Sequence, residues 1–149
     1  MRYSEAKKGR VFILRLEDKE LLQDSIERFA CEKQIMHAEI QLLGGVDKGS
    51  KLIVGPEKGR NSKVVPMVIT LDEMHEAIGN GTIIPNTSGE PKLHCHICCG
   101  RGAKTICGEI REGVIVWHVM EVIISEITNC SAIRKRDKNL GFELLYPEN

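Results

Sequence analysis

Short apolar segments separated by turn residues run through most of the chain, and this pattern predicts a protein made mainly of strands. The first segment, 9–16, is rich in β-branched and aromatic residues. Similar apolar segments predict further strands at 35–43, 46–54, 63–71, 92–99, 104–110 and 114–127. Two closing strands, 129–134 and 140–145, are predicted around a polar loop. The turn-rich segment 79–90 predicts a short strand at most.

One segment follows the helical period instead. Its apolar residues recur at helical spacing, in groups three or four positions apart: Leu21, Leu22, Ile26, Phe29 and Ala30. They predict an amphipathic helix that ends near Cys31, with Asp18 as its N-cap. The polar segment 72–77 could add one helical turn. One helix among many short strands predicts an α+β fold with a largely antiparallel sheet, and no linker divides residues 1–149, so a single domain is expected.

Composition narrows the class of protein without naming a function. The chain has 149 residues, 42% of them hydrophobic, which is enough for one buried core. Lys plus Arg and Asp plus Glu both total 21, so no net positive charge attracts the chain to nucleic acid. No apolar run approaches the roughly 20 residues that span a bilayer. The N-terminus lacks an apolar signal core, so a cytoplasmic protein without membrane contact is expected.

The cysteines cluster in a way that composition alone does not explain. Four of the six lie between Cys95 and Cys107, and His94 and His96 occupy the same stretch. In a reducing compartment, cysteines are expected to be thiols rather than a disulfide framework. The cluster therefore suggests ligand chemistry.

Strand alternation places this chemistry on one side of a predicted hairpin. His94, His96 and Cys98 share one face of their strand, because alternate side chains point the same way. If 100–103 form a four-residue loop, Cys107 faces His96 and Glu109 faces His94. Imidazole, carboxylate and thiolate are zinc ligands. We therefore predict a zinc site at His94, His96 and Glu109, with Cys107 in reserve.

Other readings of the same residues stay open. A cysteine is often a small buried apolar residue, and a histidine on a sheet face can simply pair with Glu109. A slip of one residue in register would remove Cys107 and Glu109 from the site. His118 lies in the apolar strand expected next to the hairpin, so it is a further reserve ligand. His37 and His75 are interpreted as structural or solvated.

The order of segments resembles the plants and prokaryotes conserved (PPC) domain family over nearly the whole chain, from about Arg10 onward. The specific resemblance lies in the His-x-His strand, 91–96, followed by a glycine-centred turn and a Gly-hydrophobic step at 108–110. An apolar strand with an acidic residue, 117–122, completes it. A strand that ends in a small-residue turn, 43–46, precedes these segments.

The resemblance implies a compact α+β fold that assembles as a homotrimer. Many members have a third histidine near the Gly-hydrophobic step, where this sequence has Glu109, a competent ligand that could change the metal preference. Plant members also carry a separate AT-hook, an Arg-Gly-Arg-Pro segment that enters the DNA minor groove. This sequence contains no such segment, and 100–102 is interpreted as a hairpin turn.

Three functions follow as hypotheses. The first is a metal-containing homotrimer that acts as a binding or regulatory module. The second is a metal-dependent enzyme of unknown substrate, in which Glu109 could act as general base. The third is DNA binding, a label that travels with the family; here the basic run 134–138 is its main physical support and is typical of a solvated loop. A redox role for the thiols is a minor fourth.

Overall fold

The computed structural model describes residues 1–59, 64–111 and 113–147. The elements, in chain order, are β1 (Lys7–Glu17), α1 (Leu22–Glu32), β2 (Ala38–Val46), β3 (Lys51–Pro56), β4 (Pro66–Thr70), β5 (His75–Pro85), β6 (Pro91–Arg101), β7 (Lys104–Ile110), β8 (Val116–Thr128), β9 (Ile133–Arg136) and β10 (Glu143–Tyr146). The predicted strand at 63–71 corresponds to β4, and its first residue lies outside the described residues.

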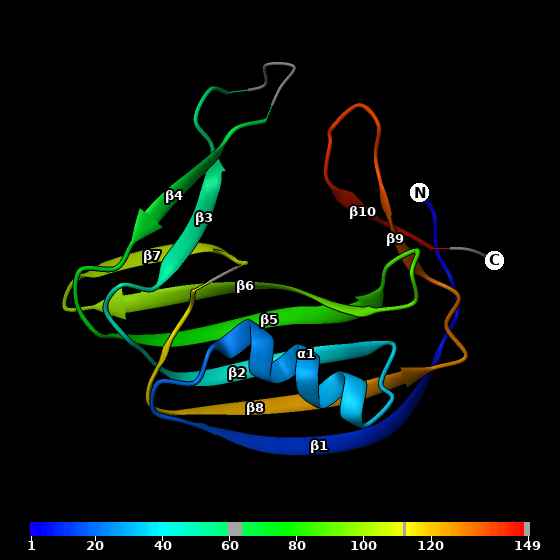
Figure 1. The fold of residues 1–149 in the computed structure, drawn as a ribbon, viewed down its shortest axis with the longest axis horizontal. Coiled ribbons are helices and arrows are strands. Elements are labelled where there is room, and N and C mark those ends of the chain that lie inside the picture. Colours follow the sequence, from blue (N-terminus) through cyan, green and yellow to red (C-terminus); the bar gives the residue numbers. More distant parts are fainter. Residues whose placement is uncertain (60–63, 112, 148–149) are drawn as a thin grey trace.

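Within these ranges the strands form one eight-stranded antiparallel sheet and a separate two-stranded hairpin (Figure 1). The order in the large sheet is β1-β8-β2-β5-β6-β7-β3-β4, and β9 pairs with β10. The prediction of a largely antiparallel sheet with one main helix is confirmed. In the described part of the chain, no helix has the length and apolar character that crossing a bilayer requires.

Helix α1 covers one face of the sheet and completes the core (Figure 1). Ile26 and Ala30 are fully buried against inward side chains of the strands, as the apolar period predicted. The predicted cap at Asp18 is wrong, because the helix begins at Leu22 and Asp18 accepts a hydrogen bond from the backbone N–H of His118 at 2.9 Å. The backbone N–H of Leu22 donates instead to the carbonyl of Val114, also at 2.9 Å.

Strand β5 is the main departure from the predicted elements. The segment 72–77 forms no helical turn, and the turn-rich residues that follow lie in an eleven-residue strand at the centre of the sheet. Gly79 and Gly81 explain the error. They lie directly opposite Ile97 and Cys95 of β6, where the two strands approach closely. Glycine here indicates close backbone approach within a strand rather than a turn.

The two faces of the sheet differ in exposure. The inner face, under α1, carries buried residues such as Ile40 and Ile97. The outer face carries large apolar side chains that this chain leaves exposed, among them Ile13, Leu43 and Ile78. The alternation along β6 places its histidines on this outer face and its buried cysteines on the inner one.

Arg10 of β1 and Glu126 of β8 form an ion pair that makes stability depend on pH. The Arg10 Nε and Nη2 atoms each lie 2.7 Å from a Glu126 carboxylate oxygen, and these bonds lower the pKa of Glu126 to about 2. A carboxyl whose pKa is lowered in the folded state stabilises it above its ordinary pKa of 4.5 and loses this contribution as the pH falls toward 2.

We therefore expect Glu126→Gln to cost about 1 kcal/mol at pH 7, a small value because water screens the half-exposed Arg10. The gap between wild type and variant should close as the pH falls from 4.5 toward 2. Urea denaturation across this range measures it. In an Arg10→Gln background, the same Glu126 substitution should leave no pH-dependent gap; a gap that persists would contradict the assignment.

Candidate metal centre

The β6–β7 hairpin has a tighter turn than predicted. Arg101 pairs with Lys104, so the loop has two residues rather than four, and Gly102 supplies a φ of 58°. Two-residue hairpin turns need positive φ and match the twist of the strands. The register therefore moves by two residues. Such a shift preserves which face each side chain occupies but changes every directly opposed pair.

The three predicted ligands lie together on the outer face. Glu109 lies directly opposite His96, whereas the prediction placed it opposite His94. His94 reaches Glu109 diagonally, with its Nδ1 3.0 Å from the carboxylate Oε1. The rings of His94 and His96 are 5.2 Å apart between centroids, in an edge-to-face arrangement. The hairpin thus gathers two imidazoles and one carboxylate on adjacent positions.

As the side chains stand, they do not converge on one point. No group of three His, Cys, Asp or Glu residues within the described ranges is arranged to hold a metal ion. Instead His94 pairs with Glu109 through a direct hydrogen bond, the alternative interpretation that the sequence left open. The donor chemistry nevertheless fits zinc, because imidazole nitrogen and carboxylate oxygen are both zinc ligands. The His94 side chain is 46% exposed, so it has room to change rotamer.

Glu109 is held as a carboxylate in a partly buried position. The hydrogen bond with His94 is the main cause of its lowered pKa, burial opposes that effect, and Arg111, whose Nε lies 3.4 Å away, adds a favourable charge. A carboxyl with a lowered pKa is ionised at neutral pH. Gly108 lets β7 pack closely on β3, since a Cβ there would lie 2.7 Å from the carbonyl oxygen of Ile53.

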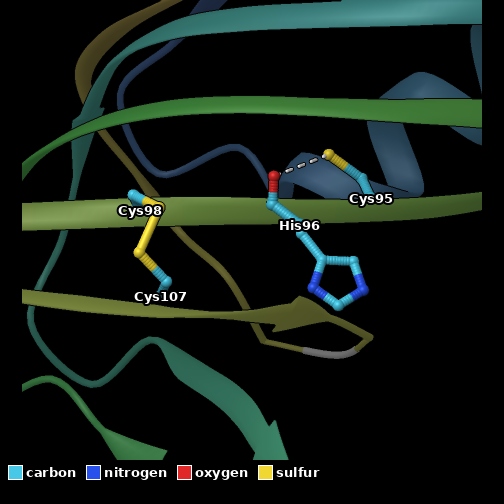
Figure 2. The surroundings of a disulfide bond; sticks show 4 residues. All are labelled: Cys95, His96, Cys98 and Cys107. Atoms are coloured by element: carbon cyan, nitrogen blue, oxygen red, sulfur yellow. Dashed lines mark hydrogen bonds between the residues drawn. A yellow bond between two sulfur atoms is a disulfide. The ribbon is translucent and has the colours of Figure 1, made fainter.

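Cys98 and Cys107 form a disulfide across the hairpin (Figure 2). The expectation that the cysteines are thiols is wrong for this pair, and in this structure Cys107 has no thiolate to offer a metal. The two-residue change in register brings Cys107 opposite Cys98 instead of His96. The feature of the sequence that could have predicted this tight turn is Gly102, which lies between Arg101 and Lys104.

The neighbouring cysteines of β6 face the core and have a different chemistry. Figure 2 shows Cys95 on the side of the strand away from the disulfide, with its sulfur directed at the His96 carbonyl. Burial raises the pKa of the Cys95 thiol to about 12 and that of Cys99 to about 11. Both remain protonated at neutral pH, so neither is a reactive thiol.

Removing the disulfide should destabilise the chain. We expect Cys98→Ser combined with Cys107→Ser to lower the free energy of unfolding by about 2 kcal/mol, because the bond closes a short loop in the unfolded chain. Urea denaturation with and without dithiothreitol measures this. Reductant should destabilise wild type and a Cys31→Ser control, where the cysteine is free and exposed, but not the double variant. An equal effect of reductant on the double variant would contradict the pairing.

His118 lies far from the hairpin in the sheet order. Its strand, β8, pairs with β1 and β2, and both β2 and β5 separate it from β6 (Figure 1). The expectation that this strand neighbours the hairpin is therefore wrong. The His118 backbone has a φ of 60°, and its ring lies 4.4 Å from the Trp117 ring. Within one chain, His118 is therefore not positioned to add a ligand beside Glu109.

The two remaining histidines each have a backbone carbonyl as hydrogen-bond partner, as expected for structural residues. The His37 Nε2 atom lies 2.7 Å from the carbonyl oxygen of Ala132. The His75 Nδ1 atom lies 2.8 Å from the carbonyl oxygen of Glu73. These bonds support the structural interpretation of both residues.

Glu109 separates two hollows in the surface. One, of about 430 Å³, reaches from His94 to the β9–β10 hairpin, and the other, of about 320 Å³, lies beside His96. Both include Arg111 and Phe142 in their walls. Hydrophobic periodicity does not predict these wall residues, because Arg111 follows the last residue of β7 and Phe142 lies in the β9–β10 turn.

The basic run at 134–138 also departs from its prediction. Strand β9 continues to residue 136, beyond the predicted strand end at Arg134, and Arg134 itself is only 7% exposed rather than solvated. Its Nη2 donates to the hydroxyl of Thr82 at 3.1 Å. Burial lowers the pKa of the guanidinium, while the charges of Glu143 and Glu109 oppose that shift. A buried arginine beside the candidate site is a feature that the charge pattern did not reveal.

Comparisons with known proteins agree on the fold. The model of the Plants and Prokaryotes Conserved (PCC) domain matches residues 3–128. No curated protein matches the chain. A crystal structure of a plant- and prokaryote-conserved protein from Pyrococcus horikoshii superposes with a TM-score of 0.83 at 24% identity, over 100% of this chain and 99% of that one.

Two further structures carry functional descriptions of their own. A metal-containing protein from Archaeoglobus fulgidus has a TM-score of 0.82 and 24% identity, covering 98% of this chain and 99% of its own. A candidate DNA-binding protein from Bacteroides thetaiotaomicron has a TM-score of 0.78 and 17% identity, over 97% and 99% of the two chains. At these identities the likeness shows the fold alone.

Proposed function

This chain belongs to the Plants and Prokaryotes Conserved domain family, and on that premise we propose that it is a zinc-containing homotrimer that acts as a binding or regulatory module. The observation that carries the metal site is the adjacency of His94, His96 and Glu109 on one outer face. When bound, zinc would offer a Lewis-acidic open position to a ligand, as three-ligand sites do. The metal-containing protein from Archaeoglobus fulgidus supports a bound metal, and the choice of zinc rests on the imidazole and carboxylate ligands.

The ionised carboxylate of Glu109 would bind the metal through one oxygen and keep its other oxygen near Arg111. The Arg111 Nε lies 3.4 Å from Oε2, whereas His94 contacts Oε1. Separate partners for the two oxygens would let one of them bind metal while the other stays oriented. Second partners of this kind fix the orientation of metal-binding side chains.

The trimer would cover the apolar outer face of the sheet. Ile13, Ile78 and Leu43 are 81%, 62% and 57% exposed in the single chain. Leu43 lies directly opposite Ile78, and Ile78 in turn lies opposite Cys98. Contiguous exposed apolar surface of this kind is typical of protein interfaces. The proposed interface would therefore border the proposed metal centre.

Elemental analysis of tag-free protein tests the metal site. We expect about one zinc per chain in wild type, and none in a variant that combines His94→Ala with His96→Ala. His118→Ala is the matched control, since that histidine lies on β8, and it should retain zinc. Absence of zinc from wild type after reloading, in protein that melts cooperatively, would overturn the proposal.

A metal-dependent enzyme is the second candidate, favoured by the two hollows that meet at Glu109. A free carboxylate beside a metal can act as general base. Zinc-loaded protein would be screened against esters and phosphate esters. If Glu109 is a base, Glu109→Gln should abolish turnover while zinc stays bound; if it is a ligand, both should fall together.

DNA binding has weaker support from the described residues. Arg134 is buried, and Arg136 lies directly opposite Glu143 in the β9–β10 pair. Duplex DNA held by phosphate contacts would dissociate steeply with rising salt. A mobility shift at low salt tests this, and no shift would remove the hypothesis.

A further inference from the structure

The hollow beside His94 is large enough to hold a small molecule. It has a volume of about 430 Å³, within the range typical of small-molecule sites. Figure 1 shows the β9–β10 hairpin at the end of the sheet where β5 ends and β6 begins. The cavity lies between this hairpin, helix α1 and the strands β6 and β7, and its wall includes Gln23, Glu27, Arg111 and Arg134.

Of the acidic side chains in the described cavity wall, Glu27 and Glu109 have partners within the chain, whereas Glu143 forms no ion pair there. Glu27 accepts a hydrogen bond from the backbone N–H of Leu93 at 3.0 Å and lies 3.7 Å from the Lys92 ammonium. Glu109 pairs with His94 and Arg111. The positive charges of Lys92 and Arg111 are therefore offset by the carboxylates of Glu27 and Glu109.

Arg134 is not matched in the same way. It is 93% buried, yet among the described residues no carboxylate forms an ion pair with it, and its Nε–H has no acceptor. The charges of Glu143 and Glu109 act on it only through space. A buried guanidinium with an unused donor is costly unless something else supplies the acceptor.

Gln23 adds a second unsatisfied atom to the same wall. Its Nε2 donates to Glu27 at 3.1 Å, but its carbonyl Oε1 is buried without a donor. An amide oxygen of this kind requires a hydroxyl or amino hydrogen. Arg134 and Gln23 both line the cavity, and each has one buried side-chain atom without a partner.

We propose that this cavity binds a small hydroxylated anion, a carboxylate or phosphate, whose charge is held by Arg134 and whose hydroxyl donates to Gln23. Arginine binds both kinds of anion through paired N–H donors. The inference rests on the proposed function in one respect: it gives the class of molecule that the metal centre at His94 would hold at its open position. Arg134 would then be the residue that determines specificity for charge.

Binding to the whole chain tests the proposal directly. Glycolate, acetate and inorganic phosphate would be titrated calorimetrically into zinc-loaded and EDTA-treated protein at matched ionic strength. We expect glycolate to bind at least about tenfold more tightly than acetate, because only glycolate carries the hydroxyl that Gln23 accepts. No heat with glycolate or phosphate at concentrations up to about 10 mM, in folded zinc-loaded protein, would overturn the proposal.

Two arginine variants distinguish a specific contact of Arg134 with the anion from a general effect of positive charge. Arg134→Gln should weaken glycolate and phosphate by about tenfold or more, whereas Arg28→Gln, an exposed arginine paired with Glu20, should not. If the Arg134 variant fails to fold, Gln23→Leu provides the second test, since it should remove the preference for glycolate over acetate. Unchanged anion binding in folded Arg134→Gln, or an unchanged preference in Gln23→Leu, would overturn the assignment.

The outcomes distinguish this inference from the proposed function. If zinc binds to wild type and no anion does, the ligand class is wrong and the metal centre stands. If zinc does not bind but EDTA-treated protein still takes up glycolate in an Arg134-dependent manner, the metal centre fails and the anion site stands. Anion binding that is equal in wild type and Arg134→Gln refutes the inference whatever the metal content.

Discussion

Replacing Leu43 and Ile78 together by glutamate is expected to leave the chain monomeric in solution. In the proposed trimer these side chains lie within the interface, and they face each other across β2 and β5. Each added carboxylate would be buried beside a like charge, which costs several kcal/mol per group. Association should weaken by about a thousandfold or more. Folding of the single chain should survive, because both residues are more than half exposed there.

Sedimentation equilibrium measures the effect. Wild type should have three times the 16.7 kDa mass of one chain, and the double variant should have that mass once. A matched control places the same charges elsewhere: Met67→Glu with Val68→Glu alters exposed apolar residues on β4, at the far edge of the sheet. That control should remain trimeric. Wild type that is monomeric at micromolar concentration would refute the trimer itself.

The sequence predicted the chemistry of β6 well because strand alternation is a local property. Once 92–99 is a strand, His94 and His96 must share a face, and Cys95 and Cys99 must share the other. The structure confirms this separation, with the histidines exposed and Cys95 and Cys99 buried. Which residues come opposite them depends on the turn, and the face pattern cannot decide that. Registers that differ by two residues have the same pattern, so the Cys98–Cys107 pair was missed.

Features that depend on distant parts of the chain could not be read from local pattern. Arg134 looks like one member of a basic run, and its burial results from packing of β9 near Thr82 of β5. The place of β8 between β1 and β2 is likewise a property of topology, and it removes His118 from the site. Strand β5 was obscured because Gly79 and Gly81 are turn residues by composition.

Gly81→Ala should cause a large loss of stability for a single added methyl group. An added Cβ would lie 2.6 Å from both the Cys95 Cβ and the His94 carbonyl oxygen. Neither neighbour can move by a side-chain rotation, so strand β6 itself must shift. Overpacking of this kind costs about 1–3 kcal/mol, and we expect the upper end because the contacts are with backbone or with atoms fixed to it. Urea denaturation measures the change.

Gly100→Ala is the matched control, because it also adds one methyl group to a strand glycine. There the atom nearest to the new Cβ, the Thr105 hydroxyl oxygen, would be 3.9 Å away, so stability should be unchanged or slightly higher. The pair also tests how the fold positions the metal centre. A shift of β6 at His94 should weaken zinc binding in Gly81→Ala and leave it intact in Gly100→Ala. Equal stabilities would mean that β5 and β6 are not held at this close approach, and that the position of His94 does not depend on the glycine opposite.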